Sequence, residues 1–268
     1  MFVTFLITFR EGLEAFLLVG ILLSYLDRLG AGRQARWIYL GVAAGLVASV
    51  VAAFVLQVLV GQLSSHAIRT VLTAAIMLLA TAILTYMAIW MGKQAKAHTD
   101  EAKRRLEAHV SAGRVLGIVA LAFLSVLREG IETVLFLSAL SYSGEGISAW
   151  GSLAGLALSI VVVWLLLRGT RQVPIAAFFR WTSLLLIVIA AGLLGSAMNQ
   201  LQVVGVAPGG TAPVFDISGW LPDSTGPGVF LRGLFGYNAT PTGLQLASWA
   251  AYLAIAVTFW GRARARGA

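Results

Sequence analysis

The sequence has 268 residues, of which 59% are hydrophobic and only 11% are charged. A water-soluble domain carries about 25% charged residues, so a soluble globular protein is excluded. The chain has no cysteine, which excludes disulfides, thiolate metal sites and thiol redox chemistry. Its net charge of +8 would suit a nucleic-acid-binding protein, but the positions of the basic residues indicate a membrane protein instead.

Seven apolar stretches follow one another along the chain. They cover residues 3–26, 37–60, 68–91, 114–140, 147–167, 181–203 and 244–260. Each is long enough to cross a hydrocarbon core of about 30 Å as a helix. We therefore predict an all-α polytopic membrane protein with seven transmembrane helices.

The basic residues lie in alternate connections between these stretches. Of the 19 Lys and Arg residues, 15 fall in four places, namely 28–36, 93–114, 168–180 and 262–266. The other connections contain only Arg69 and Arg232. Because basic loops remain on the cytoplasmic side, we expect the N-terminus outside and the C-terminus in the cytoplasm. A bacterial-type cytoplasmic (inner) membrane is the expected location.

Two connecting segments are long. Residues 92–113 have a helix-forming composition, and we expect a solvated cytoplasmic helix without an apolar stripe. Residues 204–243 are rich in Gly and Pro but also contain aromatic residues such as Trp220 and Phe230, which predicts an ordered extracytoplasmic loop with an interfacial segment.

A charged motif occurs twice. Arg10-Glu11-Gly12-Leu13-Glu14 lies in the first stretch, and Arg128-Glu129-Gly130-Ile131-Glu132 lies in the fourth. A pair of glycines four residues apart also opens the next helix in each half, at 41 and 45 and at 151 and 155. The second motif lies three spans after the first, an odd offset, so the copies must run in opposite directions. This pattern predicts the 3+3 inverted repeat of secondary transporters, with a site near the membrane midplane.

The predicted organisation has five parts. These are a first three-helix repeat (1–91), a cytoplasmic connector (92–113), a second three-helix repeat (114–203), the extracytoplasmic loop (204–243), and a seventh helix with a basic cytoplasmic tail (244–268).

The two motifs place six ionisable residues inside the membrane. Each would cost about 2.5–3.5 kcal/mol at a helix centre if it had no partner, so they must face one another or water. Arg10 and Glu14 are four residues apart and can form an ion pair, as can Arg128 and Glu132. Gly12 and Gly130 would let the two motif helices approach closely. Four Glu against two Arg leave two negative charges, which a bound cation would neutralise.

The ligand type limits the ion. Carboxylate oxygens without thiolate or imidazole suit hard cations, and His66, His98 and His109 all fall in predicted loops. Iron(III), iron(II), manganese, magnesium and calcium all remain open on this argument.

The doubled motif resembles that of the high-affinity iron permease family, the membrane component of oxidase-coupled iron uptake in fungi and of the bacterial EfeU type. The resemblance extends to Trp90-Met91-Gly92-Lys93-Gln94-Ala95 and to Gly233-Leu234-Phe235-Gly236-Tyr237 with Pro241-Thr242. It implies that Glu11, Glu14, Glu129 and Glu132 bind iron, with Arg10 and Arg128 as their charge partners.

The end of the sixth span departs from that family. The family often has a His-Glu pair there, whereas this chain has Asn199 and Gln200, followed by Leu201 and Gln202. Asn199, Gln200 and Gln202 are second-tier candidates for the ion path, and hydrogen bonding between helices is their alternative role.

The expected function is import of iron through the four glutamates. By resemblance, the iron is ferric and is supplied by a partner oxidase or peroxidase together with a periplasmic or surface iron-binding protein. We expect no permanently bound cofactor, no nucleic-acid partner and no enzymatic activity. Two alternatives are a transporter of another hard divalent cation such as manganese and a membrane-embedded di-iron oxidase. Di-iron sites usually include a Glu-x-x-His pair, which is missing from the apolar stretches.

Overall fold

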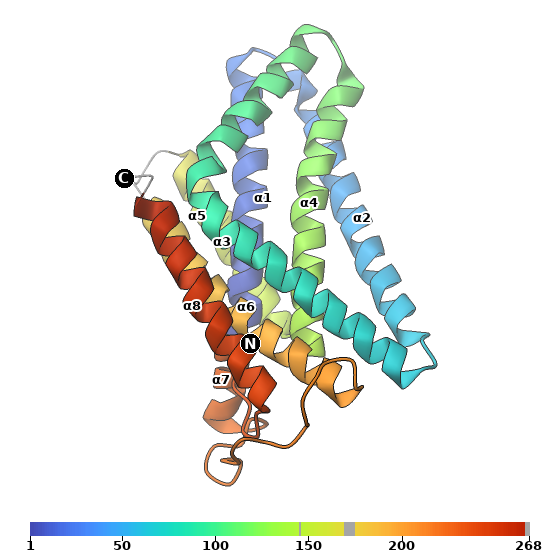
Figure 1. Cartoon of the computed structure of the whole chain (residues 1–268). Helices are drawn as coiled ribbons and strands as arrows, with labels where there is room; N and C mark the ends of the chain where they lie inside the picture. Colours follow the sequence, from blue (N-terminus) through green and yellow to red (C-terminus); the bar gives the residue numbers. More distant parts are fainter. Residues whose placement is uncertain (145, 169–174, 266–268) are drawn as a thin grey trace.

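The computed structural model describes residues 1–144, 146–168 and 175–265, with the side chains of 90–99, 175–180 and 263–265 left out. In this part of the chain the fold is all-helical (Figure 1). The helices are α1 (Phe2–Arg28), the short η1 (Gly32–Gln34), α2 (Ala35–Gly61), α3 (His66–Ser111), α4 (Val115–Tyr142), α5 (Ala149–Leu167), α6 (Ile175–Val203), α7 (Gly226–Phe235) and α8 (Gly243–Ala265).

Each of the seven apolar stretches corresponds to one long helix. Five segments of the described residues are long and apolar enough to cross a membrane, in α2 (with η1), α3, α5, α6 and α8. The helices α1 and α4 have 27 and 28 residues, which is also enough, because a helix rises about 1.5 Å per residue. They differ from the other five in carrying the charged motifs. The protein is thus a multi-pass membrane protein, while the count of seven spans stays a prediction.

A seam of small residues joins α2 to α4. Gly41 lies against the carbonyl oxygen of Val119, and Gly45 lies against that of Phe123. A side chain at either glycine would push the helices apart, as in other membrane helix pairs in which small residues allow close backbone approach. The contact four residues later in α2 is also four residues later in α4, so the two helices run parallel.

A second seam joins α5 to α1 in the same way. Gly151 lies against the carbonyl oxygen of Met1, and Gly155 lies against that of Phe5. The helices α1 and α5 therefore also run parallel. Since α1 and α2 are consecutive helices joined by the turn around residues 29–34, α1 runs opposite to α4. The third major pairing is between α3 and α6.

The helix α3 extends well beyond its membrane segment and crosses the bundle obliquely (Figure 1). Near its C-terminal end, Ala102 and Leu106 are buried in an apolar cluster with Leu26 of α1 and Ile118 of α4. The segment 92–113 is therefore helical as predicted, but the expectation of a solvated helix without an apolar stripe is wrong. Ala102, Leu106 and Val110, spaced by four residues, form such a stripe.

The histidines also lie elsewhere than predicted. His66, His98 and His109 all belong to α3 rather than to loops, and the side chain of His98 lies outside the described residues. His66 is the first residue of the helix and His109 lies in its last turn, away from the motif helices' midpoints.

The segment 204–243 is ordered at the end of the bundle that carries the N-terminus (Figure 1). It contains α7, whose Phe230 ring lies 5.7 Å from the ring of Phe2. Arg232 of α7 donates a hydrogen bond of 3.0 Å to the carbonyl oxygen of Ser143, after α4. Gly236 ends α7 in the left-handed conformation, with φ of 66°, which glycine adopts without strain.

Candidate metal centre

The motif of α1 is sealed inside the protein. Arg10 pairs with Glu11 through one terminal nitrogen and with Glu14, at 2.9 Å, through the other. The first of these nitrogens also lies 3.7 Å from the sulfur of Met87 in α3. The side chains of Arg10 and Glu11 are only 3% and 2% exposed. This guanidinium is therefore held by two carboxylates and shielded by α3.

The motif of α4 has the same pairing but different surroundings. Nε of Arg128 lies 3.0 Å from Glu132 and 3.6 Å from Glu129. Both carboxylate side chains are 13% exposed, whereas that of Arg128 is 50% exposed. A guanidinium facing hydrocarbon at mid-depth would cost about 2.5–3.5 kcal/mol or more, so its exposed half requires water or a polar neighbour.

The two motifs converge on one point. Carboxylate oxygens of Glu11, Glu14 and Glu129 all lie within 4.8 Å of one another. Two oxygens on opposite sides of an ion, with bonds of about 2.0–2.6 Å, are about 4–5 Å apart. Three carboxylates from two opposed helices could thus contact a single hard cation.

Glu132 lies beside this group without belonging to it. It interacts electrostatically with Glu11 and Glu14. One oxygen in each of Glu11, Glu129 and Glu132 is buried and has no hydrogen-bond partner in the described part of the chain. A buried acceptor without a partner carries a desolvation cost of about 1–3 kcal/mol, more when charged. A cation bound between these oxygens would remove that cost.

The motif glycines do not face each other, contrary to the sequence prediction. A Cβ atom on Gly12 would overlap the hydroxyl of Ser159 in α5, and one on Gly130 would overlap Ser49 in α2. The glycines therefore continue the two seams, and each fixes its motif helix against the small-residue face of another helix. The glutamates then project from the other side of α1 and α4 toward each other.

Sequence reasoning missed three residues at this centre. Ser49 and Ser159 lie four residues after the second glycine of each seam. A regular four-residue spacing of small residues, at 41, 45 and 49 and at 151, 155 and 159, could therefore have identified them. Met87 had no such signal, because its contact with Arg10 joins residues 77 positions apart.

The amides at the end of α6 hold helices and loops together. Gln200 accepts a hydrogen bond from Thr73 at 2.9 Å and donates one to the carbonyl oxygen of Tyr142 at 2.8 Å. Gln202 accepts from Thr242 at 2.6 Å and donates to the carbonyl oxygens of residues 208 and 210. Asn199 is half-buried beside them.

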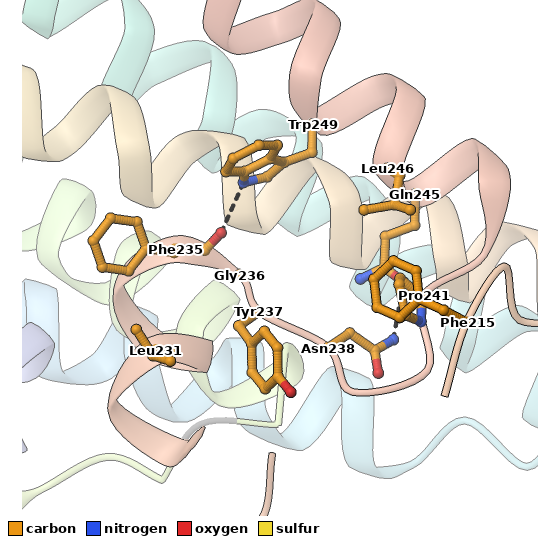
Figure 2. Close-up of a pocket in the computed structure, with 10 residues that line it drawn as sticks. All are labelled: Phe215, Leu231, Phe235, Gly236, Tyr237, Asn238, Pro241, Gln245, Leu246 and Trp249. Carbon is orange, nitrogen blue, oxygen red and sulfur yellow. Dashed lines mark hydrogen bonds between the residues drawn. The ribbon is translucent and has the colours of Figure 1, made fainter. Parts of the chain in front are cut away.

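An apolar pocket of about 330 Å³ lies apart from this centre, between α7, the turn after it and the start of α8 (Figure 2). Its lining includes Phe215, Tyr237 and Leu246 and has no charged residue. Trp249 already donates its indole N–H to the carbonyl oxygen of Phe235 at 2.7 Å, as Figure 2 shows. The pocket therefore lacks the carboxylates that gather at the motif helices, and its polar side chains include the amides of Asn238 and Gln245.

Comparisons with known proteins identify a single family. Residues 1–263 match the family described as "Iron permease FTR1 family". The chain is similar to the "Ferrous iron permease EfeU" of Yersinia pestis, with 34% identity over 94% of this chain and 90% of the relative. It is similar to proteins of the same name from Yersinia pseudotuberculosis, with 33% identity over 94% and 89%, and from Escherichia coli, with 32% identity over 94% and 92%. No solved structure matches the chain significantly.

Proposed function

The chain belongs to the iron permease FTR1 family, and from this premise we propose that it imports iron across the cytoplasmic membrane through the carboxylates of Glu11, Glu14, Glu129 and Glu132. The observation that carries the site is the convergence of Glu11, Glu14 and Glu129 within 4.8 Å. The family and the names of its relatives describe a permease rather than an enzyme.

The helix pairing supports an inverted repeat. In the proposed repeat, α1 corresponds to α4, α2 to α5 and α3 to α6. Under this correspondence the α2–α4 pair matches the α5–α1 pair, and the α3–α6 pair matches itself. The glycine contacts keep the same register after the exchange, since Gly45 meets Phe123 as Gly155 meets Phe5. In transporters built this way, the two halves rearrange around a fixed midplane site. The proposed transport cycle has this form, with seven spans, the N-terminus outside and the C-terminus in the cytoplasm.

The charge of the site supports ferrous iron. Four Glu and two Arg carry a net charge of two negative units when ionised, which one divalent ion neutralises. The relatives from Yersinia pestis and Escherichia coli carry the word "ferrous" in their names. Ferric iron supplied by an oxidase or peroxidase and an iron-binding protein, as the family resemblance implies, is the second form of this proposal. An inside-negative potential favours inward movement by about 2.3 kcal/mol per elementary charge per 100 mV.

The test is uptake of radioactive iron into proteoliposomes under a potassium-diffusion potential. Glu14→Gln and Glu132→Gln should abolish uptake while the protein still inserts, because each variant removes a carboxylate of the proposed site. Glu101→Gln is the matched control, since Glu101 is an exposed carboxylate of α3 paired with Arg104 and Arg105. Near-normal uptake by both site variants would disprove the site.

The same assay separates the candidate ions. Uptake with ascorbate, which keeps iron ferrous, should exceed uptake of chelated ferric iron without reductant. The opposite order would favour the ferric form. If excess manganese suppresses iron uptake completely and is itself taken up faster, the divalent-cation alternative replaces iron.

A further inference from the structure

The two motif arginines share a sequence environment but differ in contacts and burial. Arg10 uses both terminal nitrogens on carboxylates, lies against Met87 and is almost fully buried. Nε of Arg128 lies 3.6 Å from Glu129 and 3.0 Å from Glu132, and half of its side chain is exposed. Moving either arginine would leave two largely buried carboxylates without it, but half of the Arg128 side chain already lies outside the protein's packing.

The carboxylates paired with these arginines also differ. Glu14 contacts Arg10 and still belongs to the group of three that could hold an ion. Its counterpart Glu132 contacts Arg128 at 3.0 Å and lies outside that group. The other oxygen of Glu132 is buried and has no hydrogen-bond partner among the described residues. The two arginine-paired glutamates thus differ in position, since Glu14 lies within the group and Glu132 lies outside it.

We propose that Arg128 is a positioning residue that controls access to the site: it holds Glu132 aside, reaches water through its exposed half, and releases Glu132 to the incoming cation. This inference rests on the proposed function. In the proposed orientation α4 runs outward, so Glu132 lies about 4.5 Å nearer the outside than Glu129, and Glu14 lies on the inner side. A cation from outside meets Glu132 first, and its charge replaces that of the guanidinium.

The alternative to water access is that the exposed half of Arg128 faces lipid. On the neighbouring face of α4, Leu124 and Ile131 are 60% and 39% exposed, so this face meets lipid. Arg128 lies at the edge of that face, toward Glu132. If its exposed half faced only hydrocarbon, it would have no route into water and could not exchange with a cation. Water access at residue 128, but not one turn away at 124, is therefore the decisive observation.

The absence of cysteine allows a direct test of water access. Three single variants, Arg128→Cys, Leu124→Cys and Arg10→Cys, are reconstituted and treated with a membrane-impermeant, positively charged methanethiosulfonate reagent. We expect labelling of the first variant only. Leu124→Cys is the control for an exposed position in lipid, and Arg10→Cys is the control for the sealed motif. No labelling at position 128, or equal labelling at positions 10 and 128, would overturn the proposal.

A kinetic test separates positioning from a structural role. Arg128→Gln removes the charge that competes for Glu132, so iron should bind more tightly and leave more slowly. We expect both the apparent KM and the maximal rate to fall roughly tenfold, the factor that about 1.4 kcal/mol corresponds to. Arg128→Lys should restore both values toward those of the wild type. A lower rate with unchanged KM, proportional to lost folded protein, would show a structural role only.

The two tests distinguish this inference from the proposed function. Labelling needs no transport, so a wild-type protein that transports manganese instead of iron would still show water access at position 128. In that case the identity of the ion is wrong while the role of Arg128 stands. If iron is transported but position 128 is not labelled, the iron function stands and the role of Arg128 is wrong.

Discussion

The two copies of the charged motif differ more in their surroundings than in their sequence. In α1, the side chain of Arg10 is 3% exposed, and in α4, that of Arg128 is 50% exposed. The seams that hold the two motif helices are nearly the same, because Gly12 and Gly130 each contact a serine at the same position of the neighbouring helix. One contact on the buried side is with α3, whose Met87 sulfur lies 3.7 Å from Arg10. The repeated sequence thus gives both motif helices the same close packing, while the burial of their arginines depends on contacts outside the motif.

The largest effect should come from removing the two arginine charges in turn. Arg10→Gln leaves Glu11 and Glu14 buried without their cation, and breaking a buried ion pair in this way costs about 3–5 kcal/mol. Arg128→Gln should cost clearly less, because half of that side chain is already exposed. The measurement is thermal unfolding of the purified protein in detergent. Equal losses for the two variants would show that the motifs are energetically equivalent despite their different burial.

The seams offer the next comparison. Gly155→Ala places a methyl group against the backbone of Phe5 and the hydroxyl of Thr8. The backbone cannot move aside, so we expect a loss of about 1–3 kcal/mol. Gly45→Ala should lie at the lower end of that range, since its nearest neighbours are 3.0 Å from the added atom.

Gly61→Ala is the control for this pair, because an added Cβ atom there meets nothing within 4 Å. Its melting temperature should match that of the wild type. If Gly45→Ala proves as destabilising as Gly155→Ala, the two seams are equally tight in the membrane.

A smaller effect is expected where the motif glycines meet serine. Gly130→Ala should destabilise the protein by about 1 kcal/mol through overlap with Ser49, and adding Ser49→Gly should recover much of that loss, because contacting residues couple by about 0.5–3 kcal/mol. The pair Gly12→Ala and Ser159→Gly should behave in the same way. A double-mutant cycle on each pair measures the coupling, and a coupling near zero would mean that the serines are not what the glycines accommodate.

Much of the helical layout could be predicted from the sequence, because apolar runs of membrane length have few alternatives to a helix. All seven predicted stretches overlap one long helix each, and the doubled motif pointed to the carboxylates that converge. The resemblance to iron permeases is confirmed by the family match. The offset of three spans between the motifs also gave the opposite directions of the two motif helices.

The missed features depend on contacts between distant parts of the chain. The stripe of Ala102 and Leu106 was hidden among charged residues and became visible only where α3 packs on α1 and α4. The partners of Gly12 and Gly130 depend on the register of α5 and α2, which no local pattern specifies. The unequal burial of Arg10 and Arg128 could not be predicted, because the two motifs are nearly identical.

The smallest effect should come from Met87, whose contact with Arg10 has no described counterpart at Arg128. Met87→Leu keeps the volume and removes the sulfur, so stability should fall by less than about 1.5 kcal/mol. Arg10 keeps both carboxylates in this variant, and a thioether is only a weak acceptor. The shift in melting temperature, compared with that of Arg10→Gln, measures how much the sulfur contributes. A shift as large as that of Arg10→Gln would mean that one sulfur contact, rather than burial by α3 as a whole, makes the first motif the rigid one.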